Sequence, residues 1–202
     1  MVSYTKKEKF IVALENSEPC TNSSICTKCG GACCKTTPCG MLPHDIGDQI
    51  SVESVVNALN SGKYMIYLDV KKPKDIIIPT MAAKQTDEGR IKLNFLRKKC
   101  ALLTLTGCPL SKLERPSMGL SYIPGTPCKQ LVSNQALSRS WMTYRHLMAS
   151  VIKRETGMSL EELYTVCYEN TLAYFAVNGI QTPYENMVFE IMQLDLARLQ
   201  GN

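Results

Sequence analysis

The chain has 202 residues, of which 45% are hydrophobic and 20% are charged. This length and composition indicate a folded protein with a substantial core, made of one large or two small domains. No run of about 18 apolar residues is present, so we expect no transmembrane helix. The apolar stretch at residues 10–14 is too short for a secretory signal, and we therefore expect a cytoplasmic protein.

The formal net charge is +5, which by itself would suit an acidic partner such as a nucleic acid. However, six lysines lie within a few residues of cysteines. Metal-bound thiolates are anionic, and neighbouring cations offset that charge. Two four-thiolate sites on divalent ions would lower the net charge to about +1. We therefore expect a protein partner or protein substrate, and no nucleic acid. The six lysines are Lys28, Lys35, Lys98, Lys99, Lys112 and Lys129.

The first predicted elements are a short amphipathic helix at residues 8–15 and a cysteine-rich stretch at residues 20–39. This stretch holds six of the ten cysteines. Cys26 and Cys29 form a C-x2-C motif, in which two thiolates converge on one ion, and two glycines follow that allow a tight turn. The adjacent pair Cys33–Cys34 has two interpretations. In extended backbone the two side chains serve different sites, whereas in a turn they share one cluster.

Helical signals follow the cysteine-rich stretch. Pro43-His44-Asp45 predicts a turn into a short helix that Asp45 can cap, and His44 is an additional candidate metal ligand. Apolar residues recur at helical spacing over residues 52–59, and Gly62 supplies the stop. Ser51 and Ser54 form an imperfect capping box before this helix.

Several short strands are expected in the middle of the chain. Residues 64–70 are rich in β-branched and aromatic side chains, and residues 75–79 predict a short strand near a sheet edge because prolines flank it. Residues 91–95 alternate between apolar and polar side chains, which predicts a half-buried strand. The run 100–105 is expected to pair with it through a turn at residues 97–99.

The last third of the chain predicts three helices. The first runs from Asn134 to a stop at Gly157. Ser159 and Glu162 form a capping box for the second, and Pro183 stands at the first position of the third. The apolar and aromatic stripes of these helices are expected to be core rather than a cofactor pocket.

Together these signals predict an α+β fold. Residues 1–131 would form an irregular half with a few short strands, stapled by cysteines and metal. Residues 132–202 would form a helical region of about three helices packed on it, and the two regions together can form one single domain.

The cysteine motifs, taken together, resemble the YkgJ-type cysteine-cluster proteins, a family described as zinc- or iron-chelating. The resemblance covers about residues 20–131. The family pattern has two residues before the double cysteine where this chain has three, and this chain also has a longer loop after Pro116 and Lys129 in place of arginine. The matching motifs are Cys26-x2-Cys29-Gly-Gly-Ala-Cys33-Cys34, Lys99-Cys100, Gly107-Cys108-Pro-Leu, Glu114-Arg115-Pro116-Ser117 and Cys128-Lys129.

The resemblance implies a thiolate centre for zinc, or alternatively for iron or an iron–sulfur cluster. An eighth ligand is either Cys39 or Cys20, and Cys39 is favoured because Pro38 and Gly40 place it in a turn. Cys167 lies among apolar residues of a helix and is expected to be core. The eight candidate ligands are Cys26, Cys29, Cys33, Cys34, Cys39, Cys100, Cys108 and Cys128.

Three functions remain open from the sequence. The first is a metal-binding module that handles metal or binds a partner. The second is an enzyme that modifies a protein side chain, because flagellin lysine N-methylases have a similar cysteine cluster. The third, a dithiol redox protein, is disfavoured because no βαβ pattern follows the C-x2-C. Arg115 is expected to pair with Asp45 or with a bound thiolate, or else to be a solvated surface residue.

Overall fold

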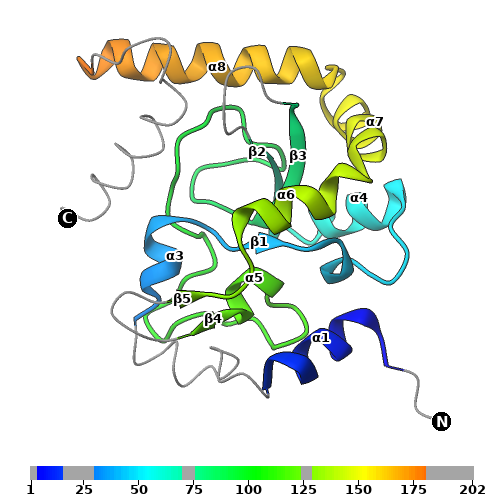
Figure 1. Ribbon diagram of the computed structural model, residues 1–202. Coiled ribbons are helices and arrows are strands. Elements are labelled where there is room, and N and C mark those ends of the chain that lie inside the picture. Colours follow the sequence, from blue (N-terminus) through cyan, green and yellow to red (C-terminus); the bar gives the residue numbers. More distant parts are fainter. Residues whose placement is uncertain (1–3, 16–29, 70–75, 124–128, 181–202) are drawn as a thin grey trace.

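The computed structural model describes residues 4–15, 30–69, 76–123 and 129–180. Helices and short strands are mixed along the chain (Figure 1), which confirms the α+β fold in its coarse form. The elements are α1 (Lys6–Glu15), α3 (Ala32–Thr36), β1 (Gly40–Met41), the 3-10 helix η1 (Pro43–Asp45), α4 (Val52–Asn60), β2 (Tyr64–Asp69), β3 (Ile78–Ala83), α5 (Ser117–Leu120), β4 (Tyr122–Ile123), β5 (Lys129–Gln130), α6 (Asn134–Met142), α7 (Arg145–Thr156) and α8 (Leu160–Val177).

The central sheet is antiparallel, with the order β1-β3-β2. The expectation that the proline-flanked strand lies near an edge was wrong, because β3 is the middle strand and contains Pro79. The short β1 pairs with Met81 and Ala82, so among the described strands Pro79, which stands opposite Leu68, has a partner on one side alone. A proline is tolerated there because no second strand needs its missing N–H.

The predicted strand at residues 91–95 was also wrong. Only Ile91 makes a bridge, to Ile66, and the side chain of Lys92 is buried where the alternation placed it outside. Cys100 does not pair with this segment either; it bridges Gln85 beyond the end of β3. Non-local contacts therefore override the local alternation in this part of the chain.

The caps predicted for α4, α7 and α8 are present, whereas Asp45 is the last residue of η1 and does not cap a following helix. Ser51 and Ser54 cap α4 reciprocally, with backbone-to-hydroxyl distances of 2.9 and 3.1 Å. Ser159 and Glu162 form the capping box of α8, and Gly157 ends α7 with a left-handed φ of 77°. These features depend on residues a few positions apart, which is why the sequence predicts them well.

The helix predicted from Asn134 to Gly157 is in fact two helices. The break between α6 and α7 follows Trp141, which is fully buried and donates its Nε1–H to the carbonyl of Met41 at 2.6 Å. The third predicted helix, beginning near Pro183, lies outside the described residues.

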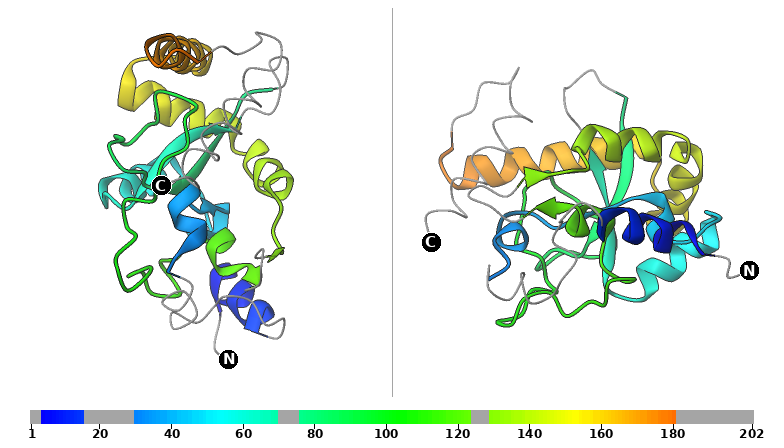
Figure 2. Two further views of the ribbon diagram at one scale, coloured as in Figure 1. Left: turned by 90° about the vertical axis from the view of Figure 1, so that its left-hand side faces the viewer. Right: turned by 60° about the horizontal axis from the view of Figure 1, so that its bottom comes forward.

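One hydrophobic core joins the two predicted regions, since Met41 and Met81 of the sheet pack in one cluster with Trp141 and Phe175 of the C-terminal helices. The helices α4 and α6 cover opposite faces of the sheet (Figure 2). In Figure 1 the sheet lies between α8 at one end of the molecule and α1 at the other. Within the described part of the chain, no helix is both long enough and apolar enough to cross a membrane.

Candidate metal centre

Two of the predicted ligands, from segments far apart in the sequence, lie in one buried cluster. Cys34 of α3 and Cys100 pack with Ala83 at the end of β3, and Cys39 and Leu103 pack against them. The exposed fractions of Cys34 and Cys100 are 9% and 4%. Thiols from the cysteine-rich stretch and from the distant segment therefore meet at the end of the central strand.

Backbone hydrogen bonds fix this meeting point. The amide of Cys100 donates to the carbonyl of Cys34 at 2.8 Å, and the amide of Ala83 donates to the carbonyl of Cys39 at 3.0 Å. The two cysteine segments are thus held to each other and to the sheet by main-chain hydrogen bonds. Such bonds form whatever side chains the residues carry.

The glycine pair before α3 sets its direction. Gly30 and Gly31 have left-handed φ angles of 65° and 69°, and the amides of Cys34 and Lys35 both donate to the carbonyl of Gly31. The Cys33–Cys34 pair is therefore part of a helical turn, and the extended alternative was wrong. A side chain at Gly31 would also collide with Leu103, whose Cδ1 lies 2.4 Å from the position of an added Cβ.

Cys39 lies against α5. An added Cβ at the buried Gly119 would be 2.9 Å from the Cys39 Sγ and 3.7 Å from the Cγ of Arg115. The absence of a side chain at Gly119 thus allows α5 to approach the thiol closely.

Cys108 is half-buried and follows a tight turn closed by two backbone hydrogen bonds between Thr104 and Gly107. It lies near Tyr64 at the start of β2. Burial, then Glu114 and Asp45, raise the pKa of Tyr64 to about 12, with a smaller contribution from the neighbouring Cys108. Cys108 is not a member of the Cys34–Cys100 cluster.

The other predicted ligands cannot be placed. Cys26, Cys29 and Cys128 lie outside the described residues, as does the side chain of Cys33. Among the described side chains, no three from histidine, cysteine, aspartate and glutamate are grouped closely enough to hold a metal ion. The described thiols do fit a thiophilic metal in chemistry, since Cys34 and Cys100 are buried together, but they make up only part of a four-ligand set.

His44 belongs to a separate polar cluster that the sequence did not predict. Its Nε2 lies 2.8 Å from the hydroxyl oxygen of Ser117, at the start of α5. That hydroxyl donates to Asp45 at 2.6 Å, and the Lys7 ammonium forms an ion pair with the same carboxylate. Burial lowers the pKa of His44 and that of Lys7, while Asp45 opposes both shifts. The cluster joins α1, η1 and α5.

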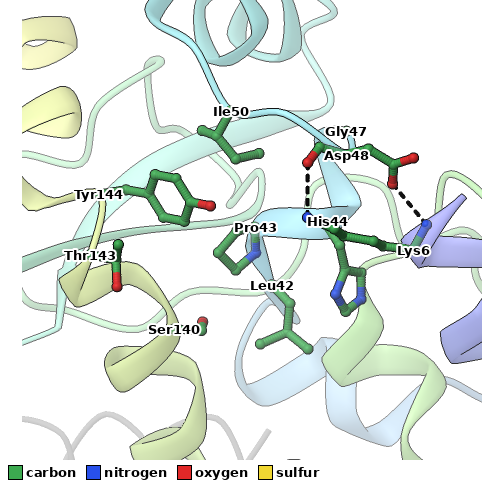
Figure 3. Close-up of a pocket in the computed structure, with 10 residues that line it drawn as sticks. All are labelled: Lys6, Leu42, Pro43, His44, Gly47, Asp48, Ile50, Ser140, Thr143 and Tyr144. Carbon is green, nitrogen blue, oxygen red and sulfur yellow. Dashed lines mark hydrogen bonds between the residues drawn. The ribbon is translucent and has the colours of Figure 1, made fainter.

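A cavity of about 340 Å³ lies beside η1 (Figure 3). Its lining includes His44 and Tyr144, and Lys6 makes two hydrogen bonds to Asp48 at its rim. None of the lining residues is a cysteine, so the cavity is not part of the thiol cluster.

Cys167 is a core residue, as predicted. Its side chain is 1% exposed, its Sγ lies 3.3 Å from the carbonyl oxygen of Lys92, and burial raises its pKa to about 12. A thiol in such a site stays protonated and is a poor metal ligand.

Comparison of the whole chain with protein-family models, with curated proteins and with solved structures found no match in any of the three. The residues and their geometry therefore carry the functional argument.

Proposed function

We propose that this protein binds a metal ion through cysteine thiolates contributed by two segments, the cysteine-rich stretch and the segment around Cys100. Zinc is the metal we favour, with iron or an iron–sulfur cluster as the alternative. The observation that supports the proposal is the buried contact between Cys34 and Cys100 beside Cys39. Structural thiolate sites are commonly built from cysteines of distant segments whose side chains are buried together.

The residues that would hold the metal are Cys34 and Cys100, completed by thiols of the cysteine-rich stretch such as Cys26 and Cys29. When bound, the metal would supply a cross-link that holds the cysteine-rich stretch onto the sheet. The chain between Cys34 and Cys100 forms a long loop, and closing this loop in the folded state has a large entropic cost, which metal–thiolate bonds offset. The protein would work in the reducing cytosol, where thiols remain available, in metal handling or in binding a protein partner.

Lysines around the cluster suit an anionic centre. Lys35 and Lys99 adjoin Cys34 and Cys100 in the sequence and are exposed, and Lys84 follows the strand on which the cluster rests. A divalent ion with four thiolates carries about two negative charges, so nearby cations stabilise the loaded form.

Serine substitutions test the proposal, with a buried thiol from elsewhere as the control. Full-length wild type, Cys34→Ser, Cys100→Ser and Cys167→Ser are purified without oxygen, and their metal content is measured by elemental analysis. We expect loss of metal from Cys34→Ser and Cys100→Ser and retention in Cys167→Ser. Full retention in both cluster variants would rule out a site shared between the two segments.

The identity of the metal decides between the binding module and the enzyme alternative. A colourless protein that contains zinc supports the module. A brown, oxygen-sensitive protein with charge-transfer absorption in the visible range indicates an iron–sulfur centre and supports an enzyme that modifies a protein side chain.

A further inference from the structure

The cavity beside η1 combines an apolar surface with a few polar side chains. Leu42, Pro43 and Ile50 supply the apolar part of its lining. Figure 3 shows the Lys6 ammonium and the Tyr144 hydroxyl pointing toward one another above Pro43. A volume of about 340 Å³ has room for a small organic molecule, and a lining of this mixed kind is typical of ligand sites.

Both polar ends are held in place by neighbouring residues. The backbone amide of Lys6 donates to the Asp48 carboxylate at 2.7 Å, and its ammonium donates to the Asp48 carbonyl at 3.0 Å. The Tyr144 ring packs edge-on against the fully buried Trp141, with the two ring centroids 6.1 Å apart. Side chains fixed in this way lose little conformational freedom when a ligand binds.

The same two ends have hydrogen-bonding capacity to spare. An ammonium has three donors, and within the described part of the chain that of Lys6 makes one hydrogen bond, to a neutral carbonyl, and no ion pair. The Tyr144 hydroxyl has no hydrogen-bond partner among the described residues. A cation beside a hydroxyl donor suits an anion. One ammonium balances the single charge of a carboxylate, whereas a phosphate group carries up to two charges.

The Asp45 carboxylate organises the polar groups next to the cavity. Its Oδ1 is engaged by the Lys7 ammonium and the Ser117 hydroxyl, and its Oδ2 accepts the backbone amides of Leu42 at 2.8 Å and Ser117 at 2.9 Å. A carboxylate offers about four lone-pair sites, and these four donors fill them. No site is left for Arg115, so the expected Arg115–Asp45 pair was wrong. Arg115 is also only 4% exposed, so the alternative of a solvated surface arginine was wrong as well.

His44 offers the cavity a hydrogen-bond acceptor whose place on the ring is fixed by this network. The single hydroxyl proton of Ser117 is used on Asp45, so the Nε2–H of His44, 2.8 Å away, donates to the Ser117 oxygen. Burial lowers the pKa of His44, and a neutral imidazole carries one N–H, so Nδ1 is left as an acceptor. Within the described residues Nδ1 has no partner, and it is not among the buried polar atoms that lack one, so it is accessible.

We propose that the cavity beside η1 binds a small organic hydroxycarboxylate, whose carboxylate lies between the Lys6 ammonium and the Tyr144 hydroxyl and whose hydroxyl donates to Nδ1 of His44. A neutral hydroxyl suits His44 because a positively charged donor would meet the Lys6 ammonium beside it. The carbon chain of the ligand would rest on Pro43 and the other apolar side chains. The cavity contains no cysteine, so this inference is independent of the proposed metal centre.

The test is a titration of the full-length protein, labelled with ¹⁵N at histidine, with 3-hydroxybutyrate and with butyrate, which lacks the hydroxyl. The chain has two histidines, and His146, an exposed residue of α7 outside the cavity, is the internal control. We expect 3-hydroxybutyrate to bind about 3- to 10-fold more tightly than butyrate, which is the effect of one neutral hydrogen bond. It should shift the Nδ1 resonance of His44 and leave the resonances of His146 in place.

Substitutions test the carboxylate contacts. Lys6→Met and Tyr144→Phe should each weaken the binding of both acids by about 10-fold, because each removes a hydrogen bond to a charged group. Lys9→Met is the matched control and should bind as the wild type does, since Lys9 is an exposed lysine of the same helix that does not line the cavity.

Three results would overturn the inference: a wild type that binds neither acid, equal affinities for the two acids, or unchanged binding in both Lys6→Met and Tyr144→Phe. If a variant does not fold, the comparison of the two acids on the wild type decides. Each of these results leaves the metal content of the wild type unaffected, so failure of this site and failure of the proposed function are told apart.

Discussion

Replacement of Gly119 by alanine should disturb Cys39 without removing any candidate ligand. The added methyl group would lie 2.9 Å from the Cys39 Sγ and 3.2 Å from its Cβ. Packed non-bonded carbon atoms normally stay about 3.5–4.0 Å apart, so the thiol or α5 must move by roughly half an ångström or more. Gly119 has no left-handed φ angle, so its backbone accepts alanine without strain of its own.

Two opposing effects set the size of the change. Overpacking a buried site costs about 1–3 kcal/mol, whereas replacing a helical glycine by alanine gains about 0.5–1 kcal/mol. The net destabilisation of the folded state should be about 1–2 kcal/mol. For a chain of this size, that corresponds to a melting temperature lower by roughly 2–8 °C.

Thermal unfolding followed by circular dichroism measures this shift, and Gly89→Ala is the control. At Gly89 the nearest atom to an added Cβ is the Ile91 carbonyl oxygen at 3.9 Å, an ordinary contact. That variant should unfold at or slightly above the wild-type temperature. Equal melting temperatures for Gly119→Ala and Gly89→Ala would refute the close approach of α5 to Cys39.

Three further predictions follow from the polar cluster and the thiol cluster. Lys7→Met leaves the buried Asp45 carboxylate without its cation, so it should destabilise the fold by about 3 kcal/mol in urea unfolding. Adding Asp45→Asn should recover part of this loss. A double variant whose loss equals the sum of the two single losses would contradict the ion pair. The pKa of His44 is lowered from 6.5 in the folded state, so the unfolded chain binds its proton first and stability should fall as the pH drops below 6.5. His44→Asn should flatten that part of the stability profile, and a profile equal to that of the wild type would reject the assignment. Complete removal of metal by a strong chelator should lower the melting temperature, since a structural thiolate site contributes on the order of 10 kcal/mol, and an unchanged melting temperature would reject a structural metal.

Local patterns predicted the helices of this protein more successfully than its sheet. The serine caps at Ser51 and Ser159 and the left-handed glycine at Gly157 depend on neighbours a few residues away. The position of β3 in the middle of the sheet depends instead on β1, a two-residue strand with no periodicity of its own. The prolines misplaced the strand as a whole, although the rule holds at Pro79 itself because β1 is too short to reach it.

The sequence predicted the thiol cluster only in part. The glycine pair before α3 and the cysteine spacing indicated a turn that gathers thiols, and this turn is present. The resemblance grouped the cysteines of both segments as candidate ligands but did not single out a contact of Cys34 with Cys100, because nothing local connects the two segments. Whether the eight candidate cysteines bind metal stays a prediction.

The polar cluster of Lys7, Asp45, Ser117 and His44 had no signal in the sequence that could have revealed it. Its members come from three segments, and each has an ordinary local role as a helix surface, cap or turn residue. Buried polar networks of this kind become visible only when the fold brings the segments together, since their stability depends on complete hydrogen bonding in three dimensions.

X-ray absorption at the metal edge of the anaerobically purified full-length protein tests the central claim most directly. We expect bound zinc surrounded by sulfur at about 2.3 Å, with four ligands in the first coordination shell. A protein without bound metal, or a shell made of nitrogen and oxygen at about 2.0 Å, would contradict it.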